Sequence, residues 1–291
     1  MKRREFLKSL TVLTATGYAM KLNALHNLSG SLNNTGKMPV LFLGHGSPMN
    51  AIELNEFSKG WRTVGKSLPV PNAILCISAH WETKGTFVTA MEKPRTIHDF
   101  GGFPQELFDV QYPAPGSPEL ALETQRQLKM TEAGLDESWG LDHGAWSLTK
   151  HLYPEANIPV IQLSLDYSKS PREHYELARE LAALREKGVL IIGSGNMVHN
   201  LRSIDRRNPD SGFDWAIETD TKIRQMIADG NHQSLMDYQK AGRAFEQSIP
   251  TPEHFLPLLY TLGLQDKKEE VGFFNAKTIM GSISMTSVRI G

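Results

Sequence analysis

Residues 189–199, Val-Leu-Ile-Ile-Gly-Ser-Gly-Asn-Met-Val-His, join a short apolar run to a glycine-rich turn and a histidine. A run of this kind, bounded by turn residues, is typical of a strand buried on both faces of a parallel sheet. The arrangement occurs twice more, because Val40–Leu43 leads into Gly44-His45-Gly46 and Ala73–Ala79 leads into His80. Ligands in open α/β sheets bind outside the carboxyl ends of the strands. The sequence therefore predicts that these three histidines meet at one rim of a sheet.

Three imidazoles at one rim indicate a metal centre, because imidazole nitrogen is a good ligand for zinc, iron, copper and nickel. For His199 an alternative is that the turn Gly193-Ser194-Gly195 binds an anion through its backbone N–H groups. His143 follows Asp142 in a turn-like segment, where core packing is the alternative to a functional role. His254 precedes an expected helix and is a further candidate for the same site.

Other common catalytic signatures are missing from the chain. It has no His-Glu-x-x-His metal-binding helix and no Gly-x-Ser-x-Gly elbow, which disfavours a serine hydrolase. Val198 stands where the third glycine of Gly-x-Gly-x-x-Gly would fall, which argues against a dinucleotide-binding fold. Four histidines are assigned no role, because they fall in a linker or on polar surfaces: His26, His151, His174 and His232. His98, beside Asp99 in a long loop, is consistent with contact to a substrate or with solvation, and we expect it to be solvated.

The rest of the chain alternates apolar runs with amphipathic segments, which predicts βαβ units and an α/β fold. A further buried strand is expected over Ile158–Leu165, and a closing strand over Thr278–Val288. Two segments carry start and stop signals that predict helices, Ser117–Gly134 and Ser170–Gly188. A further helix is expected after His45, over Glu53–Lys66.

Two stretches, Thr83–Pro115 and Arg202–Trp215, have no clear periodicity and are expected to be long loops. Loops of this length in a compact domain are often functional. Within the first, Phe100-Gly101-Gly102-Phe103-Pro104 is equally consistent with a hinged aromatic lid and with a packed turn.

Composition excludes several classes of partner. The 291 residues carry 31 basic and 32 acidic side chains and a net charge of −1, so no broad attraction to nucleic acid or to an anionic membrane is expected. Cys76 is the single cysteine, which excludes an internal disulfide and a multi-cysteine metal site, and it is expected to be a small buried hydrophobe. No apolar stretch is long enough to span a membrane.

The N-terminus has the features of a targeting segment. Lys2-Arg3-Arg4-Glu5-Phe6-Leu7-Lys8 resembles a twin-arginine export signal, and a weakly apolar stretch and a polar linker follow up to residue 37. Residues 1–37 are therefore predicted to be signal and linker. The twin-arginine export machinery would then be a partner, and the protein would be exported to the periplasm. The alternative is a basic, frayed terminus on a cytoplasmic protein.

Several motifs in order along the chain resemble one enzyme family. They are Gly44-His45-Gly46-Ser47-Pro48-Met49, Ser78-Ala79-His80-Trp81-Glu82, Gly140-Leu141-Asp142-His143-Gly144-Ala145-Trp146, Gly195-Asn196-Met197-Val198-His199-Asn200-Leu201-Arg202 and Glu253-His254-Phe255. Together they are similar to the class III (LigB-type) extradiol ring-cleavage dioxygenases, and most similar to the DOPA 4,5-dioxygenase-like branch. The resemblance runs from about residue 38 to residue 291.

The resemblance implies a single catalytic domain over residues 38–291, with a central, mostly parallel mixed sheet and helices on both faces. It implies that His45, His80 and His254 hold one divalent non-haem metal, Zn²⁺ or Fe²⁺. His199 would be the acid–base residue, close enough to act as a fourth ligand, and His143 would bind substrate. The expected reaction opens the ring of a catechol, DOPA-like in the branch named, with O₂ to a semialdehyde.

Two other functions stay open from the residues. A zinc-dependent hydrolase on the same scaffold would use the same histidines to activate water and would consume no O₂. A non-catalytic metal-binding protein would have a closed zinc site, since catalytic zinc sites keep one position free.

Overall fold

Four parallel strands form the centre of the main sheet. In the computed structural model, which describes residues 36–291, they are β1 (Val40–Gly44), β2 (Ala73–Thr83), β5 (Val160–Asp166) and β6 (Val189–Gly195). They lie in the order β5-β2-β6-β1, and β1, β5 and β6 are buried along their whole length. Burial on both faces explains why these segments are continuous apolar runs. The sequence predicted all four, although β2 continues further than expected, to Thr83.

The edges of this sheet are mixed in direction. On one side β3 (Thr86–Thr89) runs antiparallel to β5 and parallel to β4 (Ala133–Asp136). On the other side β10 (Ser287–Ile290) runs antiparallel to both β1 and β7 (Val271–Phe274). The described residues thus build an eight-stranded sheet whose centre is parallel.

One face of the sheet packs against helices that come mostly from the C-terminal half of the chain. Side chains alternate along the central strands, and Phe42, Leu75 and Ile191 belong to this apolar layer. Its helices are α4 (Pro118–Gln127), α6 (Pro171–Glu180), α7 (Ala182–Glu186), α8 (Asp214–Ala228), α9 (His232–Met236), α10 (Arg243–Ser248) and α11 (Leu256–Gly263). The predicted capping box of Ser170 and Glu173 begins α6.

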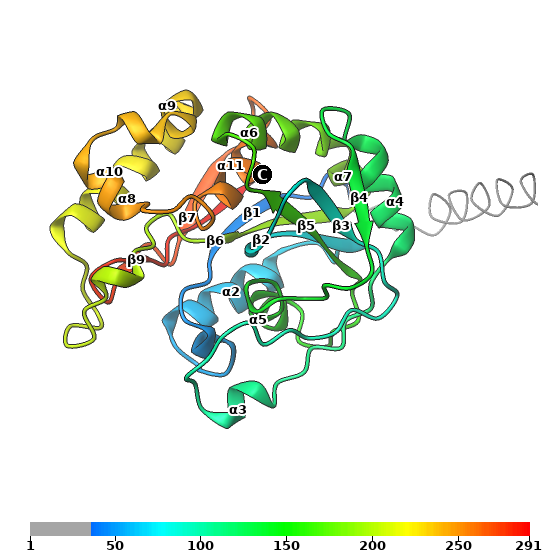
Figure 1. The fold of residues 1–291 in the computed structure, drawn as a ribbon, viewed down its shortest axis with the longest axis horizontal. Helices are drawn as coiled ribbons and strands as arrows, with labels where there is room; N and C mark the ends of the chain where they lie inside the picture. The colour runs from blue at the N-terminus through cyan, green and yellow to red at the C-terminus, as the bar shows by residue number, and fades with distance from the viewer. Residues whose placement is uncertain (1–35) are drawn as a thin grey trace, which may run out of the picture. The chain divides into compact units, whose positions relative to one another are not determined.

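The opposite face packs against a second apolar layer, to which Leu41, Cys76 and Leu190 belong. Its helical segments are η1 (Pro48–Ala51), α2 (Glu56–Ser67), α3 (Gln105–Phe108) and α5 (His143–Leu152). Figure 1 shows α2 and α5 on the other side of the sheet from α6 and α11. The fold is therefore the predicted three-layer α/β arrangement, and Cys76 is buried as expected.

Several predicted elements were wrong in extent. The helix expected over Ser170–Gly188 is divided into α6 and α7 at Leu181. The helix expected over Ser117–Gly134 ends at Gln127, and Gly134 lies in β4, where a Cβ would come within 2.6 Å of the Phe87 ring. The closing strand expected over Thr278–Val288 is divided into β8 (Thr278–Ile279), β9 (Ile283–Ser284) and β10, because Met280 and Gly281 turn the chain with φ of 49° and 79°. The first predicted long loop contains β3 and α3.

The predicted signal and linker lie, up to residue 35, outside the described residues, so export stays a prediction. Among residues 36–291, no helix combines the length and the apolar character that crossing a bilayer requires.

Candidate metal centre and substrate cavity

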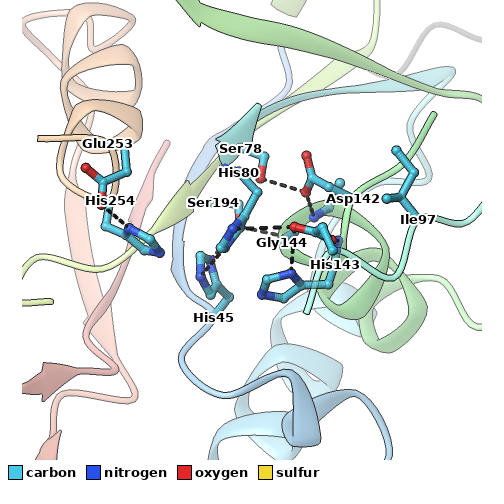
Figure 2. Close-up of polar contacts among 12 residues, drawn as sticks. His45, Ser78, His80, Ile97, Asp142, His143, Gly144, Ser194, Glu253 and His254 are labelled. Carbon is cyan, nitrogen blue, oxygen red and sulfur yellow. Dashed lines mark hydrogen bonds and ion pairs between the residues drawn. The ribbon is translucent and has the colours of Figure 1, made fainter. Parts of the chain in front are cut away.

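Three histidines from distant parts of the chain form the centre of the site. His45 directly follows β1, His80 lies near the carboxyl end of β2, and His254 lies just before α11. Their ring centroids are separated by 4.9 Å (His45–His80), 5.3 Å (His45–His254) and 5.0 Å (His80–His254). One nitrogen of each ring lies within 4.8 Å of the other two. The structure thus brings together the three residues that the family resemblance implied as metal ligands, as Figure 2 shows.

Local backbone features place these rings. The pairing of β2 with β5 is irregular between Ile77 and Glu82. His80 lies in this irregular stretch, and such an irregularity redirects side chains. The segment of His254 lies directly against the end of β6, because its carbonyl accepts the N–H of Asn196 at 2.9 Å. A Cβ on Gly195 would overlap that same carbonyl oxygen, so the close approach requires glycine there.

Ser194, in β6, determines which nitrogen of His45 carries the proton. Its Oγ donates its only hydrogen to the carbonyl of Gly144 at 2.7 Å, since a carbonyl can only accept. The contact of 2.9 Å between that Oγ and Nδ1 of His45 must then be a hydrogen bond donated by Nδ1. His45 is therefore the Nδ1–H tautomer, and its Nε2 lone pair is free.

Carboxylates determine which nitrogen carries the proton in the rings of His254 and His80. Nδ1 of His254 lies 3.0 Å from Oε1 of Glu253, and Nδ1 of His80 lies 3.5 Å from Oδ2 of Asp99. A carboxylate can only accept, so both contacts favour a proton on Nδ1 and a free lone pair on Nε2. Histidines that bind metals have this kind of partner on their other nitrogen.

The donor set fits one divalent ion. The Nε2 atoms of His45 and His80 are 3.1 Å apart, and with both protons on Nδ1 their lone pairs face one another. Two lone pairs in this arrangement repel unless a cation lies between them. Two nitrogens bound tetrahedrally to a zinc-sized ion are about 3.3 Å apart. Imidazole donors of this spacing suit Zn²⁺ or Fe²⁺.

Burial keeps the three ligand rings in their neutral form at neutral pH. Burial lowers the pKa of His80 to about 3, with a further contribution from the neighbouring His143. The pKa values of His45 and His254 lie well below the ordinary value for the same reason, because burial disfavours the imidazolium and the nearby rings add to the effect. The three rings therefore offer neutral ligands without first having to lose protons.

His199 follows β6 and lies beside the cluster. Its ring stacks on that of His254, with centroids 3.4 Å apart and planes at 11°. The backbone N–H of His199 donates to the carbonyl of Ser248 at 2.9 Å, which fixes the chain but leaves the ring free. Burial lowers the pKa of His199 to about 4, so the ring is neutral and able to accept a proton at pH 7.

His143 is the first residue of α5 and lies against His80, with ring centroids 3.9 Å apart. Asp99 accepts both its backbone N–H, at 2.8 Å, and its Nδ1–H, at 3.0 Å. Burial raises the pKa of the Asp99 carboxyl, but the hydrogen bonds and charge interaction with His143 outweigh this and leave the pKa below its ordinary value. Asp142 caps the same helix, through a hydrogen bond to the N–H of Ala145, and also accepts from Ser78.

These histidines line one end of a cavity of about 500 Å³. Two loops and the β8–β9 segment form its other walls. The wall residues are Phe100, Phe103, Leu201, Ile204, Arg206, Ile279, Met280 and Ile283. Among the lining residues, Asp99 supplies the one carboxylate and Arg206 supplies the one guanidinium. A cavity of this size, largely apolar with a few convergent polar groups, is typical of a small-molecule site.

Sequence reasoning assigned no role to Asp99, Ser194 or Arg206, although it did expect function in the loop that contains Arg206. His98 was expected to be solvated. Instead its Nε2 bonds to the carbonyl of Val110 at 2.9 Å and its ring packs in an aromatic cluster. The aromatic segment at Phe100 lines the cavity, so it is a wall of the site.

Two histidines that were expected on polar surfaces are buried. His174 bonds through Nδ1 to the hydroxyl of Tyr260 at 3.0 Å. His151 bonds through Nε2 to the carbonyl of Asn50 at 2.7 Å, and the Asn50 side chain donates to the carbonyl of His45 at 2.9 Å. His151 therefore supports the turn that follows β1.

The chain is similar to a known protein family and to several known proteins. The family model for the catalytic LigB subunit of aromatic ring-opening dioxygenase matches residues 39–285. The chain is 47% identical over 261 residues to 4,5-DOPA dioxygenase extradiol of Escherichia coli (strain K12), covering 88% of this chain and 95% of that protein. It is 38% identical over 233 residues to 4,5-DOPA dioxygenase extradiol of Mirabilis jalapa, covering 78% and 86%.

A solved structure is similar as well. The crystal structure of an uncharacterized protein from Escherichia coli K12 matches with a TM-score of 0.75 and 42% sequence identity. The match covers 87% of this chain and 100% of that one.

Ser194→Ala is expected to weaken metal binding about 10–100-fold, because His45 then loses the partner that orients its ring. Zinc affinity measured by competition with a chromophoric chelator tests this. Ser248→Ala is the matched control, because the Oγ of Ser248 is buried without a hydrogen-bond partner. Equal affinities for wild type and Ser194→Ala would show that Ser194 does not orient His45.

Metal binding at pH 6.0 is expected to release fewer than one proton per ion, because the folded-state pKa values of the ligands lie below their ordinary value. Three histidines with an ordinary pKa of 6.5 would release about two protons at that pH. Calorimetric titration with Zn²⁺ in buffers of different ionisation enthalpy gives the number. Release of two or more protons would contradict the neutral state assigned to the rings.

Proposed function

The chain belongs to the family of the catalytic LigB subunit of aromatic ring-opening dioxygenases, and from this premise we propose that it opens the ring of a catechol with a DOPA-like side chain. It is an extradiol ring-cleavage dioxygenase of the DOPA-dioxygenase-like branch. The observation that carries the proposed metal dependence and substrate is the convergence of His45, His80 and His254 at one end of a cavity large enough for such a molecule.

We assign His45, His80 and His254 to one divalent metal ion, with His199 near enough to reach it. When bound, a redox-active metal supplies the electron transfer between catechol and O₂ that neither molecule performs readily alone. Zinc has no redox chemistry, so we propose that Fe²⁺ supports turnover. The outer carboxylates of Asp99 and Glu253 balance part of the charge of an ion held by neutral ligands.

His199 is the proposed acid–base residue. It is neutral at pH 7 and lines the cavity, so it can accept a proton from a catechol hydroxyl. The resulting imidazolium is costly in a buried position, which favours the return of the proton as the ring opens. The carbon–carbon bond beside the diol breaks, and both atoms of O₂ enter the product, so no net proton is consumed. His143 faces the same space with a free Nε2, suited to accept a hydrogen bond from the substrate.

The cavity also suggests how the side chain of the substrate is held. The diol end belongs with the histidines, and the apolar lining residues Phe100, Ile204 and Ile283 suit contact with an aromatic ring. Arg206 lines the cavity and, among the described residues, makes no ion pair that would neutralise it. We assign it to a carboxylate on the side chain, since a guanidinium binds carboxylates through paired hydrogen bonds.

Oxygen uptake by purified protein, loaded with Fe²⁺ or with Zn²⁺ and given a panel of catechols, tests the proposal. Uptake with iron and a yellow ring-opened product are expected, and His199→Ala should keep its metal but lose turnover. Near-normal turnover in His199→Ala would contradict the acid–base assignment. No uptake with any catechol, in a protein that retains one tightly bound zinc ion, would favour the hydrolase.

Arg206→Gln is expected to raise KM for DOPA and for 3-(3,4-dihydroxyphenyl)propionate about 5–20-fold, with kcat little changed, because a charge-assisted hydrogen bond is lost. KM for dopamine, which has no carboxylate, should stay the same. Arg207→Gln is the matched control, because Arg207 pairs with Asp205, is 92% exposed and does not line the cavity. A parallel rise in KM for dopamine would show that Arg206 does not select for carboxylate.

A further inference from the structure

One carboxylate joins the metal side of the cavity to its substrate side. Oδ2 of Asp99 lies 3.0 Å from Nδ1 of His143 and 3.5 Å from Nδ1 of His80. Oδ1 of the same side chain accepts the backbone N–H of His143 at 2.8 Å. The Asp99 side chain is 17% exposed, so water competes little for these contacts. Both of its oxygens are thus committed to the two histidines.

The direction of these hydrogen bonds fixes which nitrogen of the neutral His143 ring carries the proton. An ionised carboxylate has no hydrogen to donate, so Nδ1 of His143 must be the donor. A neutral imidazole with its proton on Nδ1 has a bare lone pair on Nε2. His143 lines the cavity, so that lone pair is available as a hydrogen-bond acceptor for a substrate hydroxyl.

No other acid among the described residues can replace Asp99 in this role. Asp142 is adjacent in sequence to His143 and fully buried, but its oxygens accept from Ser78, from Gln162 and from the N–H of Ala145. Asp142 therefore fixes the start of α5, whereas Asp99 alone contacts the imidazole of His143.

Asp99 also lies at the end of a stretch of the loop that hydrogen bonds anchor to α5 and its neighbours. Just before it, the N–H of Ile97 donates to Leu141 and the carbonyl of Ile97 accepts from the Trp146 indole. Just after Phe100, a Cβ added at Gly101 or Gly102 would meet nothing within 4 Å. The contact with His143 is thus the last hydrogen bond that ties this wall of the cavity to α5 before the glycine pair.

We propose that Asp99 is a positioning residue, which holds His143 as the Nδ1–H tautomer and restrains the His80 ring so that both present Nε2 to the cavity. The proposal rests on the proposed function, because it makes His143 an acceptor for the catechol. Asp99 touches neither substrate nor metal in this assignment and acts only through the two rings.

Asp99→Asn is the sharpest variant, because it keeps the shape of the side chain. The amide group can donate to Nδ1 of His143, which would move the proton to Nε2 and remove the acceptor from the cavity. We expect kcat to fall about 100-fold or more, with KM changed less. Asp109→Asn, in the same loop and exposed, is the matched control and should turn over like wild type. A kcat within twofold of wild type for Asp99→Asn would overturn the proposal.

A double-mutant cycle separates positioning from a general structural role. If Asp99 acts through His143, then Asp99→Asn should cause little further loss in a His143→Ala background. Additive losses would show that Asp99 supports the fold or the metal by another route, which overturns the assignment. The metal content of wild type and of Asp99→Asn should be measured together with the rates. Two ions per wild-type chain, falling to one in Asp99→Asn, would show that Asp99 is a metal ligand and would overturn the positioning role.

The tautomer can also be measured without a variant. Nitrogen-15 shifts of the His143 ring in the full-length, zinc-loaded protein should show a protonated Nδ1 and a bare Nε2. A protonated Nε2 would contradict the proposal, even if Asp99→Asn failed to fold. This measurement needs no turnover, so it stays informative if wild type opens no catechol, an outcome that would count against the proposed function alone.

Discussion

Neutral imidazoles buried against one another impose the constraint on which the site depends. Each ring has one nitrogen that must donate a hydrogen bond and one that must stay free, and burial removes the water that would otherwise satisfy either. Ser194, Asp99 and Glu253 supply acceptors for Nδ1 of His45, His143 and His254. Ser194 lies in a strand, Asp99 lies in a loop, and Glu253 directly precedes His254 in the chain. The arrangement of the cluster is therefore decided by groups that would never touch a ligand.

The order of the strands makes this convergence possible. β6 lies between β1 and β2, so the carboxyl ends that carry His45, His80 and His199 are neighbours. The other two histidines arrive from helix starts on opposite faces, His143 at the start of α5 and His254 just before α11. The site thus lies where both helical layers meet the rim of the sheet, and each layer contributes one ring.

Much of this could be predicted from the sequence, because buried parallel strands appear as apolar runs and the residues after them must share a rim. The predictions that were wrong or missing concerned contacts between residues far apart in the sequence. His174 was expected on a surface, but it bonds to Tyr260, and Asp99 reaches His143 across 44 residues. The helix expected to reach Gly134 stops early, because pairing with β3 overrides local propensity. Register and side-chain direction decide such contacts, and one sequence does not record them.

Glycines divide the cavity into a part that resists change and a part that tolerates it. Gly144 and Gly195 lie under the cluster, where a Cβ would collide with Ser78 and His80 or with the His254 backbone. Gly101, in the opposite wall, has open space around it, whereas Gly102 has a φ of 77° that favours glycine. New substrate preferences can therefore be selected, by evolution or in the laboratory, through substitutions in the outer loops, while the reactive centre is inherited unchanged. Libraries aimed at Phe100, Gly101 and Phe103, and at residues 201–206, would explore specificity without endangering the centre.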